Sequence, residues 1–133
     1  MPPMMIKHKI PPAKKLMDEL GDISDLEIFN NQILCAVYIR PTETVVGGKA
    51  FFLTDNQVDE DKFQSKMGLV VKMGSSAFQD KSGNWFKDIT VKEGDWLILR
   101  PSDGWSITVN GVLCRIMEDA DVKGRHPNPD AIW

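Results

Sequence analysis

Short apolar segments bounded by glycine or by a Gly-Asp pair dominate the second half of this chain. They occupy residues 66–74 and 91–99, and an Asp103-Gly104-Trp105 turn follows them. Glycine and Gly-Asp pairs favour the tight turns that separate consecutive strands. This pattern is therefore typical of a small closed or rolled β-barrel, and it predicts an all-β fold.

One helix and one core strand are predicted in the first third of the chain. Residues 13–20 place apolar side chains at helical spacing and stop at Gly21, which predicts a short N-terminal helix with a glycine C-cap. Residues 33–39 are continuously apolar and β-rich, and Arg40-Pro41 follows them. That run predicts a strand buried in the core.

A hairpin and a set of boundaries complete the predicted organisation. Asn110-Gly111 is a strong hairpin signal between two apolar runs. We expect an N-terminal arm and helix over residues 1–25, a barrel domain over residues 26–122 and a C-terminal tail over residues 123–133. The tail ends in Ile132-Trp133, and we expect these apolar residues to dock on a neighbouring subunit.

The regular pattern lapses between Thr42 and Ser65. Loops of that length inside a compact domain are uncommon and tend to be functional or disordered. This one contains Gly47-Gly48 and the apolar triplet Phe51-Phe52-Leu53. One interpretation is a mobile loop that binds another protein. The other is a buried strand of the barrel, with residues 44–49 as its hairpin turn, and the residues alone favour neither.

Composition argues against several classes of function. Hydrophobic residues make up 42% of the chain and charged residues 26%, and the net charge is −3. An acidic chain has no basic field to attract nucleic acid or anionic lipid. The apolar runs are too short to cross a bilayer, and the N-terminus makes a poor signal peptide. We therefore expect a cytoplasmic protein without nucleic-acid or membrane partners.

The chain contains few residues suited to catalysis or to metal binding. Cys35 and Cys114 lie inside apolar strands, where we expect buried free thiols. His8 and His126 lie in proline-rich terminal segments without other ligands at metal-binding spacing. Neither a nucleophile elbow nor a phosphate-binding glycine loop is present. We expect no enzymatic activity, no metal and no cofactor.

Three tryptophans of the second half could stack on nucleic-acid bases. Stacking is disfavoured because the acidic chain has no basic field to attract nucleic acid. We expect Trp85, Trp96 and Trp105 to pack in the core or in an interface.

The order and spacing of these segments resemble those of GroES-like co-chaperonins. The resemblance runs over residues 26–122: a strand, a Gly-Gly loop with an apolar triplet, a Gly-x-Val-x-x-x-Gly strand, a turned excursion, a Val-x-x-Gly-Asp strand and an Asp-Gly-aromatic turn. It implies a partly open β-barrel with a long mobile loop and a roof hairpin. The long N-terminal arm and the proline-rich tail are most similar to bacteriophage-encoded members.

The resemblance also implies a function. GroES-like co-chaperonins form a homo-heptamer that caps a GroEL-like chaperonin ring and assists ATP-dependent folding of client proteins, contacted indirectly. For a phage-encoded member, the resemblance implies a viral capsid protein as the client and the host cytoplasm as the location. The alternative is a phage virion or assembly protein that reuses the fold as a structural ring and never meets a chaperonin.

Site residues follow from the resemblance by position. The chaperonin-binding mobile loop matches Gly47, Gly48, Lys49, Ala50, Phe51, Phe52 and Leu53. Lys49-Ala50 is inserted between the glycine pair and the triplet, so Ala50-Phe51-Phe52 is an alternative docking segment. The roof hairpin contains Phe78 and Trp85. Edge-to-edge pairing between subunits falls on strands that carry Ile33, Cys35, Val37, Leu113 and Ile116.

Overall fold

The computed structural model describes residues 10–39, 43–46, 49–52, 65–79, 86 and 89–132. Its elements are α1 (Pro12–Leu20), β1 (Gln32–Val37), β2 (Glu43–Val46), β3 (Lys49–Phe52), β4 (Met67–Met73), β5 (Trp96–Ile98), β6 (Trp105–Val109), β7 (Val112–Glu118) and β8 (Gly124–Arg125), with 3₁₀ turns η1 (Asp119–Asp121) and η2 (Pro129–Ala131).

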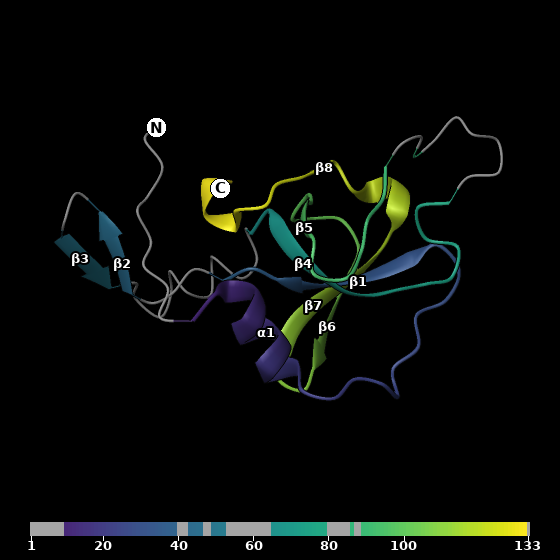
Figure 1. The fold of residues 1–133 in the computed structure, drawn as a ribbon, viewed down its shortest axis with the longest axis horizontal. Helices are drawn as coiled ribbons and strands as arrows, with labels where there is room; N and C mark the ends of the chain where they lie inside the picture. Colours follow the sequence, from purple (N-terminus) through teal and green to yellow (C-terminus); the bar gives the residue numbers. More distant parts are fainter. Residues whose placement is uncertain are drawn as a thin grey trace.

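The strands form two antiparallel sheets (Figure 1). Six of them make one open sheet in the order β6-β7-β1-β4-β5-β8, and β2 and β3 make a separate sheet. The prediction of an all-β protein with a short N-terminal helix is confirmed. The large sheet is open because its edge strands, β6 and β8, do not pair with each other.

Strand β1 lies in the centre of the large sheet and is buried on both faces. Leu34 and Ala36 belong to an apolar cluster on one face, while Ile33 and Cys35 belong to a cluster on the other. All four side chains are fully buried. A strand covered on both faces needs apolar residues at every position, which explains the continuous run that predicted this strand.

Helix α1 covers one face of the sheet at the β6–β7 hairpin. Its buried residues Leu16 and Leu20 join the cluster that contains Leu34. Asn110, in the hairpin turn, donates from Nδ2 to the carbonyl oxygen of Leu20 at 2.6 Å. Proline at the first helical position has a backbone already suited to the helix. Amphipathic spacing thus predicted the helix, and its packing partner is the sheet.

The predicted Asn-Gly turn is also confirmed. Asn110 has φ of 49° and Gly111 has φ of 84°, and Val109 pairs with Val112 across the turn. Positive φ at both central residues defines the turn whose twist matches a two-residue hairpin.

The C-terminal segment lies on its own sheet. Strand β8 pairs with β5, and the Tyr38 hydroxyl donates to Oδ1 of Asp130. Ile132 packs against the same cluster as Tyr38. Ile132 thus packs in part on its own sheet, and its docking on a neighbouring subunit stays a prediction. Trp133 lies outside the described residues.

Gly74 should be intolerant of any side chain, because it follows β4 where the chain passes close to the backbone before β1. A Cβ at this position would lie 2.2 Å from the carbonyl oxygen of Asn30. We predict that Gly74→Ala lowers the free energy of unfolding by about 1–3 kcal/mol, as overpacking does. Urea unfolding followed by circular dichroism measures it. Gly124→Ala is the control, since its nearest contact is the flexible end of Ile98 at 3.3 Å; an equal loss there would contradict the explanation.

Candidate functional site

The β2–β3 hairpin contains most of the residues predicted to bind a chaperonin. Lys49, Ala50, Phe51 and Phe52 form β3, and the register pairs Val46 with Lys49. Two residues, Gly47 and Gly48, join the strands, and they lie outside the described residues, as does Leu53. Figure 1 shows the hairpin set apart from the six-stranded sheet.

This hairpin bears on the two interpretations of the 42–65 segment. Regular structure is present there, because β2 and β3 pair over four positions, while binding of another protein by a mobile loop stays a prediction. The second interpretation correctly expected Phe51 and Phe52 in a strand, but its turn over residues 44–49 is wrong, because β2 ends at Val46 and β3 begins at Lys49. That strand, however, belongs to a separate two-stranded sheet and is not part of the six-stranded sheet.

The hairpin is attached where the chain leaves and re-enters the large sheet. Val37, the last residue of β1, pairs with Gly68 of β4. Directly beyond that pair, the backbone N–H of Tyr38 donates to the carbonyl oxygen of Met67 at 3.0 Å. Both ends of the intervening segment are thus fixed at one place on the sheet. The hairpin is an insertion between two paired central strands.

Phe78, predicted in a roof hairpin, lies at the start of the excursion between β4 and β5. Its ring contacts that of Phe86 edge-to-face, with centroids 5.4 Å apart. Both residues have positive φ, 57° and 58°, which is uncommon for large side chains. The two rings thus close the base of the excursion. Trp85 lies outside the described residues, so the roof hairpin itself stays a prediction.

Asp119 ties this base to the sheet, and the sequence reading missed it. Its carboxylate is buried and accepts from the backbone N–H of Phe78 at 2.9 Å and from Nδ2 of Asn31 at 3.2 Å. Asp119 follows β7 two residues after the buried Met117. Extending the strand alternation by one step places it facing inward, and this is the signal that could have identified it.

The predicted edge-to-edge subunit interface is wrong for both strands proposed for it. Strand β1, with Ile33, Cys35 and Val37, is hydrogen-bonded to β4 on one side and to β7 on the other. Strand β7, with Leu113 and Ile116, pairs with β1 and β6. Apolar strands with both edges occupied within one chain leave no edge for a neighbour. Among the strands that the structure describes, β6 and β8 lie at the edges of this sheet.

Both cysteines are buried free thiols, as predicted. Cys35 and Cys114 belong to the clusters on opposite faces of the sheet, so they do not face each other. Burial, with a smaller effect of Cys114, raises the pKa of Cys35 to about 12. Burial raises the pKa of Cys114 to about 11. Thiols held protonated in this way are poor nucleophiles.

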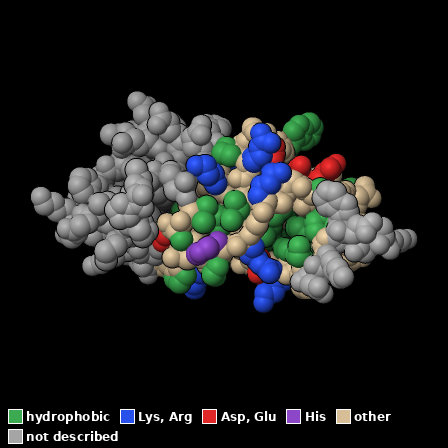
Figure 2. All heavy atoms as spheres, turned by 90° about the horizontal axis from the view of Figure 1, so that it is seen from above, with side chains coloured by type: hydrophobic (Ala, Val, Ile, Leu, Met, Phe, Trp, Pro, Cys, Tyr) green, Lys and Arg blue, Asp and Glu red, His purple; other side chains and the backbone are tan. Residues whose placement is uncertain are grey.

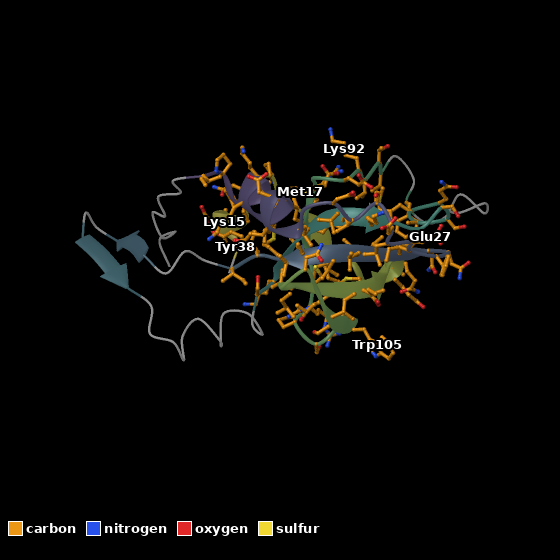
Figure 3. All side chains as sticks on the ribbon, turned by 90° about the horizontal axis from the view of Figure 1, so that it is seen from below. Lys15, Met17, Glu27, Tyr38, Lys92 and Trp105 are labelled. Atoms are coloured by element: carbon orange, nitrogen blue, oxygen red, sulfur yellow. The ribbon has the colours of Figure 1, made fainter. Side chains whose placement is uncertain are left out.

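Two of the tryptophans have opposite environments. Trp96 is in the core and contacts Tyr38 edge-to-face, with ring centroids 5.5 Å apart. Trp105 is 77% exposed at the start of the edge strand β6 and points away from the sheet (Figure 3). The expectation of core or interface packing is confirmed for Trp96, and Trp105 lies outside the core.

Charges on the described surface are mixed. In Figure 2, lysine and arginine side chains are interspersed with acidic and hydrophobic ones. Arg125 Nη1 donates to Asp95 Oδ2 at 3.2 Å and to the carbonyl oxygen of Thr90 at 2.6 Å. In the part of the chain that the structure describes, no group of three or more metal-ligating side chains comes together. Over the same residues, no helix is long and apolar enough to cross a membrane.

No family model matches the chain, and no curated protein matches it.

Removing the Asp119 carboxylate should destabilise the fold. Asp119→Ala leaves the N–H of Phe78 and the amide of Asn31, both partly buried, without their acceptor. A fully buried unsatisfied donor costs about 1–3 kcal/mol, so we expect a total loss of about 1–3 kcal/mol. Urea unfolding measures the loss. The control is Asp18→Ala, which removes an exposed ion pair with Lys14 and is expected to change stability by at most about 0.5 kcal/mol. Equal effects of the two variants would show that Asp119 is not a structural tie.

Because both thiols are buried, we predict that the protein loses stability at alkaline pH. Because their pKa values rise on folding from 9.0, the unfolded chain loses its thiol protons first. The free energy of unfolding should therefore fall as the pH rises above about 9. Chemical unfolding between pH 8 and pH 11 measures this fall, and the free energy of unfolding of a Cys35→Ala/Cys114→Ala variant should fall less steeply.

The burial of the two thiols can also be tested by their reactivity. At pH 8 the folded protein should not react with a thiol reagent until it is unfolded. Fast reaction in the folded state would contradict the burial.

Proposed function

We propose that this protein is a GroES-like co-chaperonin, a ring of identical subunits that caps a chaperonin through the β2–β3 hairpin. The observation that carries the proposal is the position of this hairpin. It holds Phe51 and Phe52 in a sheet of its own and is inserted between β1 and β4, which pair with each other. The order of the strands along the chain supports the same proposal.

The six-stranded sheet supports the proposed fold at a coarse level. It is antiparallel and open, and its excursion between β4 and β5 falls where GroES-like proteins carry the roof hairpin. Phe78, Phe86 and Asp119 fasten the base of that excursion. In the proposed assembly, seven such subunits form a dome over the chaperonin, without a catalytic activity of their own.

The energetics of the proposed contact favour weak binding by each hairpin and strong binding by the ring. Burying one large apolar side chain contributes about 1.5–3 kcal/mol, and ordering the bound segment opposes this gain. Joining several sites on one ring raises overall affinity by roughly 10²–10⁴ without any new contact. Such a cap binds as a whole and is released when the chaperonin changes state during its ATP cycle.

The test is native mass spectrometry of the protein alone and then with a host chaperonin, with and without ATP. A heptamer that joins the chaperonin when nucleotide is present is the expected result. Phe51→Ala/Phe52→Ala should leave the ring intact and abolish its capture, because the apolar contact is lost. Phe29→Ala removes a phenylalanine that is 67% exposed elsewhere and should bind normally.

Three outcomes would contradict the proposal. A stable ring that ignores every chaperonin offered would favour the alternative of a structural ring in a phage virion or its assembly. A monomer at micromolar concentration would remove the assembly itself. Unchanged capture by the Phe51→Ala/Phe52→Ala variant would remove the hairpin from the contact.

A further inference from the structure

Trp105 is held in its exposed position by a tight turn. Gly104, directly before it, has φ of 80°, and a Cβ there would lie 2.6 Å from the carbonyl oxygen of Ile116. At the other end of the turn, Nη1 of the buried Arg115 donates to the carbonyl oxygen of Arg100 at 3.4 Å. A side chain presented by a fixed backbone loses little freedom on binding, which favours its use as an anchor.

A shallow groove of about 320 Å³ lies beside this side chain. Trp105 pairs with Ile116 across β6 and β7, and Glu118 pairs with Gln32 across β7 and β1. These four residues and Asp121 line the groove. Its floor therefore extends over three strands, next to the outer edge of the sheet.

The groove has a negative rim. Glu118 and Asp121 form reciprocal caps at the 3₁₀ turn η1, in which the Glu118 N–H donates to Asp121 Oδ2 at 3.2 Å and the Glu118 side chain accepts from the Asp121 backbone. Both caps engage backbone donors. Over the described residues, neither carboxylate forms an ion pair with a lysine or arginine. The complementary ligand is a cation.

The edge beside the groove suits an extended chain. Strand β6 is the last strand of the sheet, and its outer edge pairs with no other strand in the described part of the chain. A free edge offers main-chain hydrogen bonds to an added strand. Tryptophan beside carboxylates also favours lysine and arginine, which bind to its face as well as to the charges.

We propose that an extended, lysine- or arginine-bearing segment of another protein binds along β6, with its cation between Trp105 and the carboxylates of Glu118 and Asp121. The main chain of that segment adds to the edge of the sheet, and its stem packs on the indole. This site is distinct from the β2–β3 hairpin and does not depend on chaperonin capping.

The test uses a fluorescein-labelled eight-residue peptide of alternating lysine and valine, and the same peptide with glutamate in place of lysine. Fluorescence anisotropy at low salt should show binding of the lysine peptide and little binding of the glutamate peptide. Trp105→Ala should weaken binding roughly tenfold or more, as loss of a buried aromatic anchor does. Glu118→Gln/Asp121→Asn, in which amide oxygens still accept the capping hydrogen bonds, should abolish the preference for lysine.

A control variant distinguishes specific binding at this site from nonspecific binding. Met17→Ala removes an exposed apolar side chain on α1, well away from Trp105 in Figure 3, and should bind like the unaltered protein. Equal binding of the two peptides, or undiminished binding by either groove variant, would overturn the proposal. So would a loss of self-association in Trp105→Ala by analytical ultracentrifugation, since the groove would then be an interface between copies of this chain.

Discussion

The pairing of β1 with both β4 and β7 is the constraint on which the other elements depend. Side chains of β1 are buried on both faces, so this strand connects two apolar clusters that are otherwise separated by the sheet. Removing that apolar surface from water is the main favourable term in the fold. Helix α1 covers one face, and the segments around Ala77, Phe78 and Val91 cover the other. The β2–β3 hairpin leaves from the end of the same strand.

A second constraint is polar: the hydrogen bonds that the buried carboxylate of Asp119 accepts. Asp119 is a buried carboxylate that joins the end of β7, the approach to β1 and the start of the excursion at Phe78. A buried charge is tolerated when donors surround it, and here those donors come from segments far apart in sequence. The first residues of the excursion between β4 and β5 are therefore held in a defined position on the sheet.

Most of the large sheet was predictable because local rules and tertiary burial agree there. The apolar run of β1, the Asn110-Gly111 turn and the helix ending at Gly21 each follow from a local rule, and the structure uses each as expected. The sequence-based predictions were wrong where they had to say which strands pair with each other. Nothing local indicates that β1 and β7 pair within one chain, and so an interface was assigned to strands that have no free edge. The β2–β3 hairpin was treated as irregular because its four-residue strands are too short to show a period.

The sequence by itself determined the kind of element at most positions, because alternation, helical spacing and turn residues act over a few neighbouring residues. It also determined that Cys35 and Cys114 are buried, since both lie in apolar runs. The tertiary structure alone decided which strands are edges, that the C-terminal segment packs on its own sheet, that Asp119 faces inward and that Trp105 remains exposed. These outcomes depend on contacts between residues distant in the chain, whose free energy appears only when the whole sheet has formed.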